Sequence, residues 1–312
     1  MDTRFPAFAQ SALTIIFIGM RNRALQWVLG VLMGAGATGF PATNTNSVVL
    51  PFRLERGHVM LGGQLNQGPH VSLMVDTGYG LSMLHPDLVH EIGLQRRGKV
   101  TIVGIAGEED ADMFEGAVLD FAGLTYAPRR VAALPSDRER SRRRDGVLGS
   151  GFFRRFVVQI DSKSNTITLY EPKAFDYAGT GEVLPITFKR DTPIVDGSIV
   201  LTNGQVVSAK FELDTGCDGD LCLASDFVKA NKLADTDVGR RSHRSGVGGG
   251  RGIISGTVPE VRLGRLSVTK PSASFFLEGS PAEPGMAGHI GWDLLRRFKV
   301  TVDYEHKRLI LE

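Results

Sequence analysis

The sequence predicts a mostly-β protein built from two similar lobes. The tripeptide Asp-Thr-Gly occurs at residues 76–78 and again at 214–216, each time directly after a short apolar run. The segments that follow each copy occur in the same order. Runs rich in β-branched residues alternate with Gly-rich and polar turns, and helical patterns are scarce. We therefore expect an all-β fold with a few short helices.

The overall composition allows a globular protein and excludes several other classes. A chain of 312 residues can form one large domain or two ordinary ones. The net charge is only +2, so the sequence predicts no nucleic-acid partner. Two cysteines are too few for a scaffold held together by disulfides.

The first 42 residues predict a signal peptide or membrane anchor with a short linker. The basic stretch 21–23 precedes an apolar run at 24–37 that ends in Ala35-Gly36-Ala37. This order is typical of a secretory signal that is cleaved after Ala37. A membrane anchor over residues 12–33 is the alternative, although Arg21 and Arg23 would interrupt it at a high cost, and a soluble tail is the third. Both export interpretations predict a periplasmic, secreted or membrane-anchored protein whose lobes lie outside the cytoplasm.

The first predicted lobe covers residues 48–175. A strand-like stretch leads to the first Asp-Thr-Gly, and a short helix is expected afterwards, with Pro86 in its first turn. The lobe closes with "GVLGSGFFRRFVVQIDSKSNTITLYEP", which predicts a turn, a helical segment and a final hairpin. The polar turn of that hairpin is expected at residues 162–165.

A Gly-rich linker at 176–182 joins this lobe to a second one at 183–312. The second lobe repeats the order strand, Asp-Thr-Gly, helix start and closing block. Its helix is expected to begin with Ser225 as the N-cap. Its closing block, "GHIGWDLLRRFKVTVDYEHKRLILE", again predicts a final hairpin. The repeated order indicates an internal duplication.

Two such loops would bring two carboxylates together if the lobes pack about a pseudo-two-fold axis. Asp76 and Asp214 would then face each other across that axis. Two carboxylates a few ångströms apart cannot both ionise easily, so they share a proton. One can accept a proton while the other donates one, and a water held between them could attack a peptide carbonyl.

The paired motifs resemble those of the pepsin/retropepsin-like aspartic proteases, in the bacterial-type form with two lobes in a single chain. The second half of the family motif is two hydrophobic residues and a Gly, which is matched by Val147-Leu148-Gly149 and by His289-Ile290-Gly291. The resemblance covers nearly all of the chain after residue 48. It implies two β-barrel-like lobes, an aspartic endopeptidase with a polypeptide substrate, no metal or cofactor, and a monomer.

The resemblance also implies a role for individual residues. Asp76 and Asp214 would be catalytic, with Thr77 and Thr215 interlocking the two loops beneath them. The glycines of the two motifs, Gly78 and Gly216, would let backbone amides approach the carboxylates. Two Gly-rich hairpin tips would act as flaps over the substrate, namely Gly104, Ile105, Ala106 and Gly107 in the first lobe and Gly248 and Gly249 in the second.

Three positions depart from the family pattern. Tyr79 and Cys217 follow the two motifs, where a small hydroxyl residue or Ala is usual, and His289 replaces an apolar residue. Cys is a poor hydrogen-bond donor, so the usual tuning of the carboxylate pair is altered. A catalytically inactive peptide-binding protein, or an envelope-anchored interaction protein on the same fold, is therefore the alternative function. Pairing of Cys217 with Cys222 stays open.

Overall fold

The computed structural model describes residues 47–133, 145–234 and 240–312. The chain divides into two units, residues 1–43 and 44–312, and all described residues lie in the second. The expected export segment at 1–42 lies outside the described residues. Among the helices that the structure describes, none is long and apolar enough to cross a membrane.

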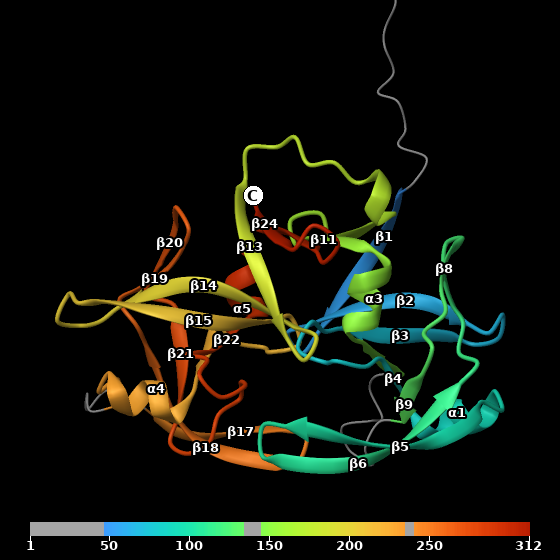
Figure 1. Cartoon of the computed structure of the whole chain (residues 1–312), viewed down its shortest axis with the longest axis horizontal. Helices are drawn as coiled ribbons and strands as arrows, with labels where there is room; N and C mark the ends of the chain where they lie inside the picture. Colours follow the sequence, from blue (N-terminus) through green and yellow to red (C-terminus); the bar gives the residue numbers. More distant parts are fainter. Residues whose placement is uncertain (1–46, 134–144, 235–239) are drawn as a thin grey trace, which may run out of the picture. The chain divides into compact units, whose positions relative to one another are not determined.

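Strands dominate the N-terminal lobe, which confirms the predicted all-β fold for this part of the chain (Figure 1). One antiparallel ribbon of this lobe, β5 with β6, extends away from the other strands. Among the residues described before β10, this lobe contains one helix, α1 (Pro86–Glu91). Its strands are β1 (Ser47–Glu55), β2 (His58–Leu65), β3 (His70–Val75), β4 (Met83–Leu84), β5 (Gln95–Gly104), β6 (Gly107–Glu115), β7 (Leu119–Phe121), β8 (Leu124–Tyr126), β9 (Val131–Ala133) and β10 (Gly146–Leu148).

The C-terminal lobe repeats this construction. It also carries an extended ribbon, β17 with β18, and the described part before β22 contains one helix, α4 (Ser225–Ala230). Its strands are β13 (Glu182–Lys189), β14 (Thr192–Val200), β15 (Val206–Asp214), β16 (Leu221–Leu223), β17 (Arg240–Gly246), β18 (Gly249–Thr257), β19 (Glu260–Leu263), β20 (Leu266–Thr269), β21 (Ser272–Phe276) and β22 (Gly288–Gly291).

The same three pairings surround the Asp-Thr-Gly strand of each lobe. In the N-terminal lobe β3 pairs parallel with β10, β10 antiparallel with β4, and β4 parallel with β9. In the C-terminal lobe β15 pairs parallel with β22, β22 antiparallel with β16, and β16 parallel with β21. The two predicted site loops therefore leave their sheets in equivalent surroundings.

A third sheet joins the two lobes through their final hairpins. Its order is β1, β12 (Thr166–Tyr170), β11 (Val157–Asp161), β23 (Lys299–Asp303), β24 (Arg308–Leu311) and β13, and every pairing in it is antiparallel. The first strand of each lobe continues from this sheet into its own lobe. Residues 47–51 of β1 pair with β12, whereas residues 52–55 pair with β2.

Both final hairpins form as the sequence predicts, and for the same physical reason. β-Branched residues fill the strands, and a carboxylate at the end of the first strand accepts a backbone N–H in the turn. Asp161 accepts from the amide of Lys163 at 2.8 Å, and Asp303 accepts from the amide of His306 at 3.0 Å. Each turn also contains a residue with positive φ, Asn165 in one case and Lys307 in the other.

The helices α1 and α4 form where the sequence predicts them, but the predicted N-cap of α4 is wrong. Pro86 occupies the first turn of α1, as expected, and the ring of His85 accepts a hydrogen bond from the amide of Asp87. The prediction of Ser225 as an N-cap is wrong. The amide of Val228 donates to the carbonyl of Ala224, so α4 begins one residue earlier and Ser225 lies in its first turn. Two further helices, α3 (Ser150–Arg155) and α5 (Trp292–Leu295), follow Gly149 and Gly291 directly, and a 3₁₀ turn covers Pro172–Ala174.

The N-terminal lobe packs around an aromatic cluster in which Phe152 is central. This side chain is fully buried, and its ring makes edge contacts with neighbouring rings at centroid distances of 5.3–5.9 Å. Those rings belong to Phe121, Tyr126, Phe153 and Phe156. Because α3 directly follows β10, this packing holds the carboxyl end of the β3–β10 pair in place.

We predict that Phe152→Ala lowers the free energy of unfolding by about 3–5 kcal/mol, because it removes a large buried ring and leaves a cavity. Val206→Ala is the control, since the Val206 side chain is 50 % exposed and its loss should cost less than about 0.5 kcal/mol. Urea denaturation followed by circular dichroism measures both. Equal midpoints for the two variants would contradict the assigned packing.

Candidate active site

The two Asp-Thr-Gly loops begin where two parallel strand pairs end. Val75, the last residue of β3, lies beside Leu148 of β10, and the amide of Asp76 donates to the Leu148 carbonyl at 3.1 Å. In the other lobe Asp214, at the end of β15, lies beside Gly291 of β22. The equivalent strand ends point the two loops toward each other.

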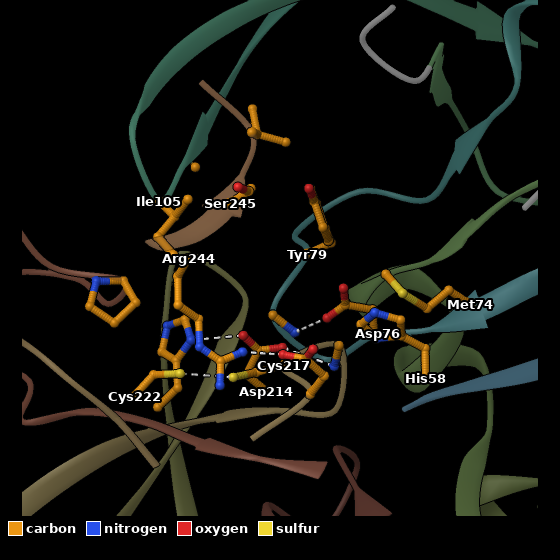
Figure 2. A pocket seen from close by; sticks show the side chains of 18 of the residues that line it. His58, Met74, Asp76, Tyr79, Ile105, Asp214, Cys217, Cys222, Arg244 and Ser245 are labelled. Atoms are coloured by element: carbon orange, nitrogen blue, oxygen red, sulfur yellow. Dashed lines mark hydrogen bonds and ion pairs between the residues drawn. The ribbon is translucent and has the colours of Figure 1, made fainter. Parts of the chain in front are cut away.

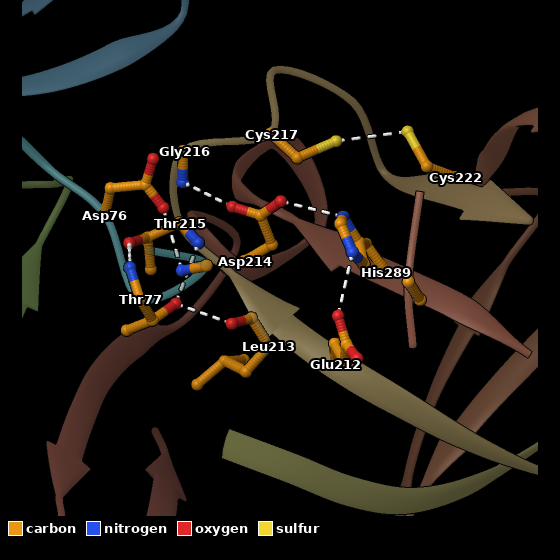
Figure 3. A network of polar contacts seen from close by, with 12 residues as sticks. Asp76, Thr77, Glu212, Leu213, Asp214, Thr215, Gly216, Cys217, Cys222 and His289 are labelled. Carbon is orange, nitrogen blue, oxygen red and sulfur yellow. Dashed lines mark hydrogen bonds and ion pairs between the residues drawn. The ribbon is translucent and has the colours of Figure 1, made fainter. Parts of the chain in front are cut away.

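Thr77 and Thr215 link the loops by four hydrogen bonds between the lobes (Figure 3). Each amide donates to the hydroxyl of the other threonine at 3.0 Å. Each hydroxyl in turn donates to a backbone carbonyl of the strand that precedes the opposite motif. The Thr77 hydroxyl donates to Leu213 at 2.6 Å, and the Thr215 hydroxyl donates to Val75 at 2.9 Å. Both threonines are completely buried, so each hydroxyl satisfies backbone groups that water cannot reach.

The glycines after the threonines allow the carboxylates to come together. The Gly78 amide donates to Asp76 Oδ1 at 2.8 Å, and the Gly216 amide donates to Asp214 Oδ1 at 2.9 Å. A methyl group on Gly216 would overlap the carboxylate of Asp76, and one on Gly78 would lie 2.8 Å from Asp214 Oδ1. Each glycine therefore lies against the carboxylate of the opposite lobe, where no larger residue fits.

A buried chain of ionisable groups extends from Asp214 into the C-terminal lobe. His289 Nδ1 lies 2.7 Å from Asp214 Oδ2, and His289 Nε2 lies 3.0 Å from Glu212 Oε2 (Figure 3). The exposed fractions of the side chains are 13 % for Asp214, 12 % for His289 and 6 % for Glu212. Each ring nitrogen of His289 therefore contacts one carboxylate, Nδ1 that of Asp214 and Nε2 that of Glu212.

The contacts among Asp214, His289 and Glu212 favour the charged form of the His289 imidazole. Burial alone would lower the pKa of His289, but the charge of Asp214 and hydrogen bonds with Asp214, Cys217 and Glu212 raise that pKa well above its ordinary value. Burial alone would raise the pKa of Asp214. The charge and hydrogen bond of His289, a hydrogen bond with Asp76 and the Gly216 amide together lower it. Asp214 is therefore the carboxylate with the stronger support for its ionised form.

The surroundings of Asp76 are different. The residues equivalent to Glu212 and His289 are Met74 and Val147, which are both buried in an apolar cluster with Met60. Figure 2 shows Met74 beside Asp76. The two lobes therefore give the two carboxylates different environments, since Met74 and His58 lie beside Asp76 (Figure 2) and a buried imidazole contacts Asp214.

Cys217 and Cys222 lie on the same side as His289. Their sulfur atoms are 3.1 Å apart, and both thiols are free. A hydrogen bond with Cys222, together with burial, raises the pKa of Cys217 well above its ordinary value. Cys217, Asp214 and His289 each offer one ligand atom, and these three atoms lie within 4.8 Å of one another, so these residues could hold a metal ion.

A cavity of about 1160 Å³ lies above the carboxylates and is lined by both lobes (Figure 2). The N-terminal lobe contributes Met60, Met74 and Tyr79, and the C-terminal lobe contributes Cys217, Asp218 and Arg244. Arg244 forms an ion pair with Asp218 inside this lining. The cavity is concave, and its lining combines apolar side chains with a few polar and charged groups.

The two predicted flaps are the tips of the ribbons β5–β6 and β17–β18, and they contact each other over the cavity. The amide of Ala106 donates to the carbonyl of Val247 at 3.3 Å, and Arg251 Nη2 donates to the Ala106 carbonyl at 3.1 Å. Ile105 and five glycines complete the two tips and the lining next to them, namely Gly104, Gly107, Gly246, Gly248 and Gly249. A side chain at Gly104 would overlap Val247, so this contact requires glycine.

Glu212 and Arg244 were not predicted as site residues from the sequence, whereas Val247 lies within the Gly-rich stretch 246–252 predicted as the second flap. Glu212 had a readable signal, since it is a charged residue in an apolar strand two positions before Asp214 and would point to the same side of the strand. His289 was noted only as an irregular residue. Arg244 and Val247 lie in a Gly-rich stretch whose pairing partner could not be read from sequence.

We predict that Thr77→Val and Thr215→Val each lower the free energy of unfolding by about 1–3 kcal/mol, because each leaves buried backbone groups without a partner. Thr125→Val is the matched control, since Thr125 is exposed and should change stability little. Chemical denaturation measures all three variants. A buried-site variant as stable as the control would contradict the role given to these hydrogen bonds.

Comparison with known proteins agrees with this geometry. Residues 60–152 match the family model described as "Aspartyl protease", a stretch that runs from β2 to α3. The structure is similar to the crystal structure of aspartic proteinase from Irpex lacteus, with a TM-score of 0.54 and 16 % sequence identity. That match covers 85 % of this chain and 96 % of the other. A comparison with curated protein sequences found no match. Residues 60–152 therefore match an aspartyl protease family, and the described part of the chain has the fold of an aspartic proteinase.

Proposed function

We propose that the protein is an endopeptidase in which Asp76 and Asp214 together activate the attacking water. The observation that carries this proposal is the interlocked pair of loops, which brings both carboxylates into contact at the floor of the cavity. Such a pair provides a general base and a general acid at one point, and it needs no nucleophilic side chain.

The different surroundings of the two carboxylates support a division of roles. Asp214 is ionised beside His289 and accepts a proton from the water as it attacks the peptide carbonyl carbon. Asp76 carries the shared proton and donates it to the carbonyl oxygen. The tetrahedral intermediate then collapses and the C–N bond breaks. Asp214 gives the proton taken from the water to the departing amine, and a hydroxyl proton of the intermediate returns to Asp76. Because the two groups titrate together, the apparent pKa values belong to the pair.

The shape of the cavity supports an extended polypeptide as the substrate. The flap tips cover the carboxylates, so a substrate must lie between the tips and the catalytic loops. Apolar side chains fit the wall formed by Met60 and Met74. The opposite wall, with Asp218 and Arg244, favours polar groups. We expect the flap contact between Ala106 and Val247 to open when substrate enters.

The proposal includes export of a single-chain enzyme. It rests on the basic and apolar pattern of residues 1–42 and on the presence of both Asp-Thr-Gly motifs in one chain. The proposed lobes, 48–175 and 183–312, would then act outside the cytoplasm without a second subunit. N-terminal sequencing of the exported product tests the cleaved signal, and residues 21–37 still attached would exclude it.

We predict that Asp76→Asn and Asp214→Asn each lower kcat for peptide cleavage by at least about 100-fold, because each removes one partner of the acid–base pair. A denatured mixed-protein substrate, assayed from about pH 3.5 to 7.5, detects cleavage without knowledge of the sequence specificity. Asp226→Asn, in the helix α4, is the control for an Asp outside the cavity. A folded but inactive parent protein would favour the binding-protein alternative, with Tyr79 and Cys217 as the altered positions.

We predict that the double variant Glu212→Met/His289→Val shifts the pH–rate profile upward by about 1–3 units. These are the residues found at the equivalent positions, Met74 and Val147. A cation within a few ångströms lowers the pKa of a carboxylate by about this amount, so its removal raises the pKa values of the pair. The control Asp196→Asn/Lys210→Gln removes an exposed ion pair and should leave the profile in place. A profile unchanged in the buried variant, measured with a metal chelator present, would contradict the role assigned to His289.

A further inference from the structure

The C-terminal lobe carries a set of metal-ligand atoms at the base of the cavity, and the set includes an oxygen of the catalytic Asp214. Cys217 Sγ, one imidazole nitrogen of His289 and one carboxylate oxygen of Asp214 lie within 4.8 Å of one another. They come from two chain segments separated by more than 70 residues in sequence, and the parallel pairing of β15 with β22 brings those segments together. Thiolate, imidazole and carboxylate are the three ligand types that bind zinc in proteins.

The second observation is the support behind the histidine. A metal-bound histidine usually donates its other ring N–H to a carboxylate, which fixes the tautomer and the ring orientation. Glu212 Oε2 lies 3.0 Å from His289 Nε2, and its side chain is only 6 % exposed. The remaining nitrogen, Nδ1, therefore faces Asp214 on the side of Cys217, as Figure 3 shows.

The N-terminal lobe indicates that this arrangement is not a general requirement of the fold. Met74, Val147 and Tyr79 occupy the positions equivalent to Glu212, His289 and Cys217. None of these three offers a ligand of the same kind. A donor set with a buried supporting carboxylate is thus present beside only one of the two Asp-Thr-Gly motifs in the described residues.

We propose that Asp214, Cys217 and His289 bind a divalent zinc ion, with Glu212 orienting the histidine ring. The fourth coordination position is open to water from the cavity. Binding releases one proton from the Cys217 thiol and one from His289 Nδ1, so that two anionic ligands balance the charge of the ion.

Zinc at this position would switch off proteolysis. The metal would hold the Asp214 oxygen that has to accept a proton from the attacking water. It would also displace the Nδ1 proton through which His289 supports that carboxylate. The site is therefore a reversible inhibitory site that depends on free thiols. The metal-binding assignment goes beyond the proposed peptidase function and does not require it.

The test is zinc binding by isothermal titration calorimetry on the reduced protein, with Co²⁺ as a spectroscopic substitute. We expect one ion per chain and a thiolate-to-cobalt charge-transfer absorption. Glu212→Gln should weaken zinc binding by about 10–100-fold, and Cys217→Ala and His289→Leu should weaken it by at least that factor. His58→Leu and Ser245→Ala are the matched controls, since both residues line the same cavity but lie outside the donor set. Both controls should bind zinc as the parent does.

Asp76→Asn separates this inference from the proposed function. The variant should lose cleavage and still bind zinc as the parent does, because Asp76 is not a ligand. In the parent protein, zinc should suppress cleavage and a chelator should restore it. Absence of saturable binding would overturn the inference, as would binding that is undiminished in Cys217→Ala and His289→Leu, or equally diminished in the two controls. Circular dichroism of every variant establishes that it is folded.

Discussion

The site depends on the reciprocal hydrogen bonds between Thr77 and Thr215. These bonds cross between the lobes at a point where neither amide nor carbonyl can reach water. A buried backbone group without a partner is expensive, so each loop can take its observed path only when the other is present. The glycines after the threonines then bring the carboxylates of Asp76 and Asp214 together. Approach of two like charges, which is unfavourable by itself, is thus imposed by the packing of the lobes.

The two lobes share their backbone pairings but differ in the chemistry beside each carboxylate. Met74 and Val147 stand at the positions beside Asp76 where the Asp214 side has a buried imidazole between two carboxylates. The backbone of the two lobes is therefore approximately symmetric, whereas the electrostatic surroundings of Asp76 and Asp214 differ. This difference assigns the base and the acid in the proposed reaction. The proposed metal-ligand atoms of the described residues also lie on the Asp214 side, so the same residues would support catalysis in the metal-free protein and inhibit it when metal-bound.

Much of this arrangement can be predicted from sequence because the motifs repeat. The order of elements in each half predicts the all-β fold and the final hairpins, and the Asp-Thr-Gly copies predict which loops meet. The predicted N-cap at Ser225 was wrong because helix starts are decided by single backbone hydrogen bonds. The ion chain through Glu212 and His289 depends on which strands lie side by side. β15 and β22 pair in parallel although they are far apart in the sequence, and the local pattern of residues does not predict such a pairing.

The most direct test of the account is a crystal structure with a peptide whose scissile amide is replaced by a hydroxyl-bearing tetrahedral carbon. Such a group imitates the intermediate formed by water attack and should bind more tightly than the corresponding peptide. The account predicts that its hydroxyl lies within hydrogen-bonding distance of both Asp76 and Asp214, beneath the tips at Ala106 and Val247. A ligand held by one carboxylate only, or bound away from the pair, would contradict the claim that the two interlocked loops form one catalytic unit.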